Sequence, residues 1–146
     1  MRTILNILAV VSFVWAAGPA LAGDKDVTLY KNPQCDCCEG YADYLRENGF
    51  EVAVKPTHDL AQMGREAGIP DKFQGCHLSM IDGYVVSGHV PIATVEKMLT
   101  ERPDIAGVTL PGMPMGSPGM GGTKEGPFEM LEITKSGTIG GVYARE

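Results

Sequence analysis

The four cysteines of this 146-residue chain are the residues best suited to chemistry. Three of them lie within four positions, in Cys35-Asp36-Cys37-Cys38, and Cys76 follows far downstream, directly before His77. Thiolate is the form of cysteine that binds metal ions, and the positive end of a helix favours thiolate over thiol. Because the cluster falls at a predicted strand-to-helix junction, the pattern indicates a metal site with Cys76 as the fourth sulfur.

Disulfide bonds are the alternative use of four cysteines in an exported chain. The spacing argues against a purely structural framework. A Cys37–Cys38 bridge would be strained, and a Cys35–Cys37 bridge would close a small ring. A Cys35–Cys38 bridge has the spacing of a thioredoxin motif and is geometrically reasonable. For Cys76 alone, the alternative is a buried and inert cysteine.

Further donor atoms come from histidine rings and methionine thioethers. The thioethers lie in a glycine- and proline-rich stretch that excludes a helix, so they are free either to bind a metal or to pack the loop. The histidines are candidates for direct ligation or for a supporting hydrogen bond. The donors whose role the sequence leaves open are His77, His89, Met113, Met115 and Met120. We expect His58 to lie on the surface.

The arrangement of the cysteines favours Cu(I) over zinc. Structural zinc sites usually present paired Cys-x-x-Cys knuckles, whereas this chain has three clustered cysteines and one distant cysteine. Adjacent thiolates bridge several Cu(I) ions more easily than they spread around one tetrahedral ion, and thioethers also select Cu(I). We therefore predict a multinuclear Cu(I) site formed by Cys35, Cys37, Cys38 and Cys76.

The elements that must position these residues predict an α/β domain. Strands are predicted at 27–30 and 52–54, helices at 37–48, 59–67 and 91–100, and hairpins at 78–87 and 129–143. Asn48-Gly49 ends the first helix, Asp59 can cap the second, and Asp82-Gly83 forms the turn of the first hairpin. The order strand, helix, strand, helix, hairpin, helix is that of a thioredoxin- or glutaredoxin-like domain. In such a domain, the loop before the first hairpin lies opposite the cysteine motif, so Cys76 should face the other three sulfurs. Between Pro103 and Pro127 we predict a long Gly/Pro/Met-rich loop.

The first 22 residues have the pattern of a secretory signal peptide. Arg2 provides a positive start, residues 4–17 are almost entirely apolar, and Ala20-Leu21-Ala22 is a typical cleavage site. This apolar run is shorter than the ~20 residues of a spanning helix. We therefore expect export, cleavage, and a mature domain at 23–146 without a membrane anchor. The net charge of −6, without a basic run, argues against nucleic acid or anionic lipid as a partner.

Together these features resemble the CopG family of small periplasmic copper-resistance proteins. The resemblance extends from about Val27 to the C-terminus. It rests on the motifs Cys35-x-Cys37-Cys38, Asp59-Leu60, Gly68-Ile69-Pro70, Cys76-His77, Gly88-His89-Val90-Pro91 and the methionine-rich segment 111–120. The chain departs from the family pattern at Asp36, Gly75 and Leu78, where glycine, serine and threonine are expected.

The resemblance implies a thioredoxin-like fold, a periplasmic location and copper held by the four cysteines. It also implies a redox role in copper detoxification, either interconverting Cu(I) and Cu(II) or cycling thiols. Copper ions are then the primary partner, together with other periplasmic copper proteins. Two alternatives stay open: a thiol–disulfide oxidoreductase that acts on proteins through Cys35 and Cys38, and a passive copper chaperone or store. Cys37 and the methionines favour copper because disulfide exchange needs neither. Whether the protein is an enzyme is not decided by the sequence.

Overall fold

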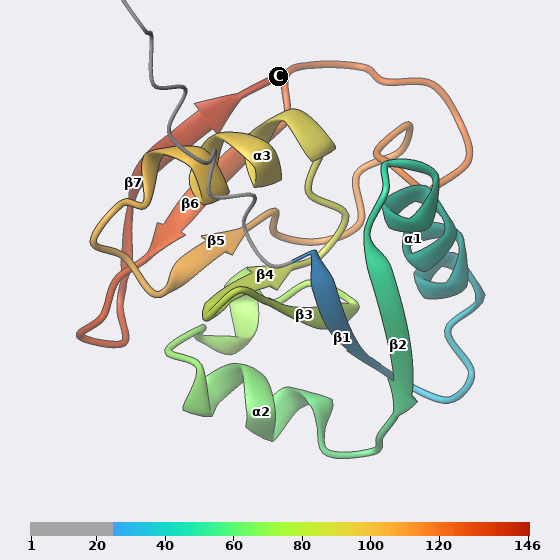
Figure 1. Cartoon of the computed structure of the whole chain (residues 1–146), viewed down its shortest axis with the longest axis horizontal. Coiled ribbons are helices and arrows are strands. Elements are labelled where there is room, and N and C mark those ends of the chain that lie inside the picture. Colours follow the sequence, from blue (N-terminus) through green and yellow to red (C-terminus); the bar gives the residue numbers. More distant parts are fainter. Residues whose placement is uncertain (1–24) are drawn as a thin grey trace, which may run out of the picture.

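Figure 1 shows the computed structural model, in which residues 25–146 are described. The predicted signal peptide at 1–22 lies outside the described residues. Within 25–146, no helix combines the length and the apolar character needed to cross a membrane.

A mixed sheet of seven strands organises the described part of the chain, in the order β2-β1-β3-β4-β5-β6-β7 (Figure 1). The strands are β1 (Asp26–Lys31), β2 (Glu51–Pro56), β3 (His77–Ile81), β4 (Tyr84–Ser87), β5 (Gly107–Thr109), β6 (Glu129–Ile133) and β7 (Ile139–Arg145). The β1–β2 and β4–β5 pairs are parallel, and the other neighbouring pairs are antiparallel. Because β1 and β2 are parallel, the helix between them crosses over one face of the sheet.

Helices cover both faces of this sheet. Helices α1 (Asp36–Glu47) and α3 (Ile92–Glu101) pack into the larger apolar cluster, with Val86 of β4. Helix α2 (Leu60–Glu66) packs into a smaller cluster with Val85, the neighbouring residue of the same strand. Successive strand residues point to opposite faces, so the two clusters lie on opposite sides of the sheet. A short 3-10 helix, η1 (Asp71–Phe73), follows α2.

The predicted order of elements is confirmed from β1 to α3, and so is the C-terminal hairpin of β6 and β7. The turn between β3 and β4 has positive φ at both Asp82 (47°) and Gly83 (82°), as the tight Asp-Gly hairpin turn requires. The domain is therefore α/β, with the element order expected of a thioredoxin-like unit followed by an added β5-β6-β7 segment.

Two local predictions need correction. Asp59 occupies the position before α2, but its side chain makes no capping hydrogen bond; instead its backbone N–H donates to Thr57 Oγ1. The stretch from Pro103 to Pro127 is not all loop, because β5 lies within it. A three-residue strand is too short to show alternation, and this one is buried throughout between β4 and β6.

Candidate metal centre

The start of α1 and the residue before β3 bring the cysteine sulfurs together. Cys35 directly precedes α1, and Cys37 and Cys38 lie in its first turn. Strands β1 and β3 pair antiparallel with Lys31 opposite His77, so the end of β1 and the beginning of β3 lie side by side. This register places Cys76 beside the cysteine motif, as predicted.

The sulfur atoms form a compact group, all within 4.8 Å of one another. Cys76 Sγ lies 3.5 Å from Cys38 Sγ and 3.9 Å from Cys37 Sγ. Cys35 Sγ and Cys37 Sγ are 3.4 Å apart. Donor atoms at such separations are able to share metal ions between them.

Cys35 and Cys38 are joined by a disulfide, and Cys37 and Cys76 are free thiols. This is the pairing with thioredoxin-motif spacing, and it is the oxidised state of the motif. A site of four thiolates requires this bond to be reduced. Cys38 is fully buried whereas Cys35 is partly exposed, so a reductant in solution meets Cys35 first.

The thiol of Cys76 is protonated in the metal-free protein. Burial, together with the neighbouring Cys37, raises the pKa of Cys76 to about 12. The thiol donates toward Nε2 of His89, which lies 3.0 Å from the sulfur. A metal ion at this sulfur must therefore displace a proton.

Both histidines beside Cys76 are fully buried. His89 Nδ1 lies 2.6 Å from the carbonyl oxygen of Pro118, which only accepts, so Nδ1 carries the proton and Nε2 presents its lone pair to Cys76. His77 Nδ1 is 3.4 Å from the same sulfur. Burial lowers the pKa of both rings, that of His77 to about 3 with a contribution from His89. Both rings are therefore neutral near pH 7, which is the state that binds metals.

Tyr41, on α1, fixes the orientation of these rings. Its ring stacks on His77 with centroids 4.5 Å apart and meets His89 edge-on at 5.5 Å. Its hydroxyl donates to the carbonyl oxygen of Val90 at 2.9 Å. Spacing along the chain does not predict these contacts, because His77 and His89 lie 36 and 48 positions away from Tyr41.

Lys31 is a second residue beside the site that the motifs of the sequence do not single out. Its side chain is only 5% exposed, and its Nζ donates to the carbonyl oxygen of Cys35 at 3.0 Å and pairs with Glu39 at 2.9 Å. The amine thus ties the end of β1 to the residue that begins the cysteine motif. A signal was present, because Lys31 follows Val27 and Leu29 at alternate positions of β1, where an inward-facing residue is expected.

The methionine-rich segment 111–120 lies against α1 (Figure 1). It is joined to the site by the hydrogen bond from His89 Nδ1 to the carbonyl oxygen of Pro118. Met113 and Met115 are each 54% exposed, and Met120 is partly buried. The structure thus brings His77 and His89 to Cys76 and leaves two of the three thioethers largely in solvent. His58 is exposed, as predicted.

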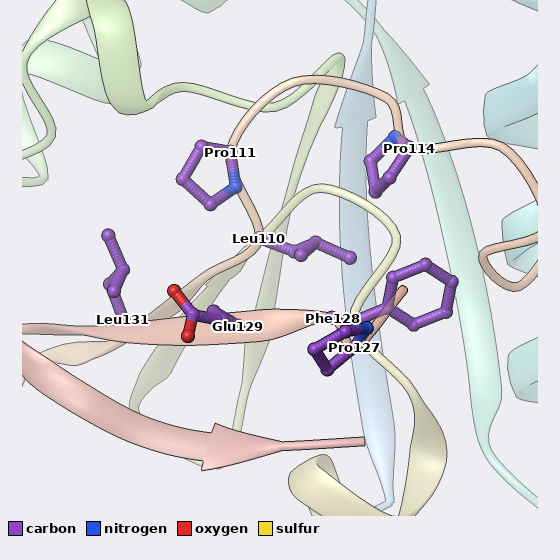
Figure 2. A pocket seen from close by; sticks show the side chains of 7 residues that line it. All are labelled: Leu110, Pro111, Pro114, Pro127, Phe128, Glu129 and Leu131. Carbon is purple, nitrogen blue, oxygen red and sulfur yellow. The ribbon is translucent and has the colours of Figure 1, made fainter. Parts of the chain in front are cut away.

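An apolar pocket of about 350 Å³ lies where this loop meets the segment leading into β6 (Figure 2). Its lining contains no cysteine, histidine or methionine, and the carboxylate of Glu129 is paired with Arg145 at 2.7 Å. The pocket therefore offers no free metal donor and is separate from the sulfur cluster.

Comparisons with known proteins agree with this geometry. A family model described as a protein of unknown function, DUF411, matches residues 73–120, a span that includes Cys76, both buried histidines and the methionines of the loop. No curated protein sequence matches the chain. Two solved structures, "Copper resistance protein copG" in Form 2 and Form 1, are each 34% identical to it, with TM-scores of 0.75 and 0.74. Each match covers 83% of this chain and 97% or 96% of the other. The chain therefore belongs to the CopG family of copper resistance proteins.

Proposed function

We propose that the reduced protein binds Cu(I) through Cys35, Cys37, Cys38 and Cys76, as a multinuclear thiolate site, and serves copper resistance after export to the periplasm. The observation that carries this proposal is the convergence of sulfurs from two segments of the chain, 3.5 Å apart at Cys38 and Cys76. Thiolates are soft donors that select Cu(I). The names of the two similar solved structures support copper as the cargo.

The Cys35–Cys38 disulfide supports a redox role for this site. Two Cys thiols at positions 35 and 38 can give up two electrons and two protons as the S–S bond forms, and these electrons reduce two Cu(II) ions to Cu(I). Reduction of the bond by an external thiol restores both thiolates. Copper binding and disulfide formation therefore compete for the same sulfur atoms, which links copper release to oxidation.

The test is an anaerobic Cu(I) titration of the reduced protein, with native mass measurement and competition against a Cu(I) chelator. We expect more than one Cu(I) per chain. Cys76→Ser and Cys37→Ser should weaken binding to a similar degree, because a shared cluster loses a bridging sulfur in either case. His58→Gln, which changes an exposed ring, is the matched control and should bind like the unsubstituted protein. Unchanged copper binding by Cys76→Ser would overturn the four-sulfur site.

The second candidate is a thiol–disulfide oxidoreductase acting on protein substrates. It is favoured by the contrast between partly exposed Cys35 and fully buried Cys38, since an exposed attacking sulfur and a buried resolving sulfur suit disulfide exchange. In that case Cys76→Ser should leave the rate of disulfide exchange with a protein substrate unchanged. Weak copper binding by the unsubstituted reduced protein would then favour this candidate.

A further inference from the structure

The free thiol of Cys76 lies against the Cys35–Cys38 disulfide without being part of it. We propose that Cys76 is a third redox cysteine: its sulfur exchanges with this disulfide, so that the bond moves to Cys38 and Cys76, and Cys35 becomes a free thiol. The inference goes beyond the proposed copper function, because the exchange needs no metal ion. The oxidised chain then holds its disulfide in either of two places.

The separations of the sulfurs favour Cys38 and Cys76 as the second pair. Cys76 Sγ lies 3.5 Å from Cys38 Sγ, so the two atoms must approach by about 1.5 Å to reach the length of a disulfide. The other free thiol, Cys37, lies 3.4 Å from Cys35 Sγ, but a bond between these two residues would close a small ring. Cys76 is therefore the better placed of the two free thiols.

A rotation of the Cys76 side chain precedes the exchange. A thiolate attacks one sulfur of a disulfide and displaces the other. All four sulfurs lie within 4.8 Å of one another, which is too close for the sulfurs of Cys76, Cys38 and Cys35 to lie on one line. Turning about the Cα–Cβ bond of Cys76 brings its sulfur opposite the bond that breaks.

His89 supplies the acceptor for the thiol proton. Its Nδ1 donates to the carbonyl oxygen of Pro118, so the lone pair on Nε2 faces Cys76 Sγ at 3.0 Å. Tyr41 meets this ring edge-on, with centroids 5.5 Å apart, and helps to hold its orientation. Because the thiolate rather than the thiol is the nucleophile, an acceptor at this position is what the exchange requires.

The exchange conserves atoms and electrons. The proton of Cys76 passes to Nε2 of His89, the thiolate attacks Cys38 Sγ, and the Cys38–Cys76 bond forms as the Cys35–Cys38 bond breaks. The leaving thiolate of Cys35 takes up a proton, and His89 returns its own proton to solvent. These three cysteines hold one disulfide and one thiol before and after the step, so no external oxidant or reductant takes part.

The two positions of the disulfide differ in access from solvent. Cys35 is partly exposed, whereas Cys38 is fully buried. The sulfur of Cys76 lies against the buried rings of His77 and His89, at 3.4 and 3.0 Å. Exchange therefore moves the disulfide away from the surface and leaves Cys35 free to react while the chain stays oxidised.

The experiment uses the metal-free, oxidised Cys37→Ser chain, in which Cys76 is the free thiol. Excess iodoacetamide is added, and samples taken over time are digested with trypsin and analysed by mass spectrometry without reduction. Positions 35 and 38 lie in one tryptic peptide, 32–46, and Cys76 lies in another, 73–97. The original disulfide leaves these peptides separate, whereas the exchanged disulfide joins them and leaves Cys35 alkylated.

We expect the joined peptides to increase with time together with alkylated Cys35, because each exchange exposes Cys35 to the reagent. Adding Cys76→Ser to this chain is the control and should give neither product. His89→Gln on the same background should slow the increase by at least about tenfold, since it removes the proton acceptor. His58→Gln changes an exposed ring and should leave the rate unchanged.

A chain with Cys35→Ser and Cys37→Ser tests separately whether the two remaining sulfurs can join. Oxidised glutathione should convert it to the Cys38–Cys76 disulfide within single chains, and circular dichroism checks the fold of every variant. The proposal is overturned if the Cys37→Ser chain gives no joined peptides, if their fraction does not grow, or if the two-cysteine chain stays unjoined. An unchanged rate in His89→Gln would overturn the role of His89.

Failure here is distinct from failure of the proposed copper function, which is tested on the reduced chain with Cu(I). It is also distinct from disulfide exchange with a protein substrate, because attack by another protein on Cys35 does not use Cys76.

Discussion

The backbones of Gly40 and Gly119 lie in contact. A Cβ atom on Gly40 would be 2.9 Å from the carbonyl oxygen of Gly119, and a Cβ atom on Gly119 would be 2.5 Å from the amide nitrogen of Tyr41. Gly40 lies two residues after Cys38 on α1, and Gly119 directly follows Pro118, whose carbonyl binds His89. This contact therefore places the methionine-rich loop on α1, the helix that begins directly after Cys35 and contains Cys37 and Cys38.

We predict that Gly40→Ala moves the loop away from α1. The new methyl group would overlap the backbone of Gly119, and overpacking of this kind costs about 1–3 kcal/mol. Because Ala favours a helix more than Gly does, any loss of stability must come from the loop contact. Urea unfolding measures the cost, and limited proteolysis should cut the variant faster between residues 111 and 126.

Gly121→Ala is the matched control in the same loop, because a Cβ atom there meets nothing within 4 Å. It should leave both stability and the rate of proteolysis close to those of the unsubstituted chain. Equal behaviour of the Gly40 and Gly121 variants would show that the loop does not need the Gly40 contact.

Lys31→Met should destabilise the protein by about 2 kcal/mol, the typical contribution of a hydrogen bond to a charged group. The change removes the donor to the Cys35 carbonyl and the partner of Glu39, while the methionine keeps most of the buried volume. Lys97→Met is the control: Lys97 is 42% exposed and pairs with Glu101 one helical turn away, so its loss should cost much less than loss of the buried amine. Chemical unfolding of both variants checks the difference, and equal costs would argue against a structural role for the buried amine.

The methionines of the loop should affect the rate of copper loading more than its final extent. Met113 and Met115 are each 54% exposed, so Leu at positions 113, 115 and 120 should cost less than about 1.5 kcal/mol per site while removing every thioether of the loop. Stopped-flow transfer from a Cu(I) donor should show slower loading with unchanged occupancy. Unchanged loading combined with a lowered melting temperature would instead assign the methionines to packing.

The mature protein should begin at Gly23. The Ala20-Leu21-Ala22 site after a short apolar segment is the basis for this expectation. N-terminal sequencing of the protein from a periplasmic extract is the measurement. Recovery of residues 1–22 with the protein in a membrane fraction would contradict it.

The sequence by itself determined the local structure and the types of donor. Asp82-Gly83 predicts the β3–β4 hairpin because these two residue types tolerate the positive φ angles of a tight turn. Asn48-Gly49 predicts the end of α1 because glycine readily adopts a positive φ, and Gly49 has a φ of 84°. The clustering of Cys35, Cys37 and Cys38 is likewise visible in the chain. Such features depend on neighbours only a few positions apart.

Only the tertiary structure decided the detailed contacts between distant residues. The expected order of elements already placed Cys76 opposite the cysteine motif, but the register of β1 against β3 sets its distance from Cys38, and the bond from His89 to Pro118 joins residues 29 positions apart. Strand β5 also depends on β4 and β6, since three residues carry no periodic signal of their own. Spacing along the chain contains no information on side-chain contacts of this kind, because strand pairing and packing of the whole sheet determine them. The position of Cys76 between the other sulfurs and the two buried histidines is therefore a property of the fold.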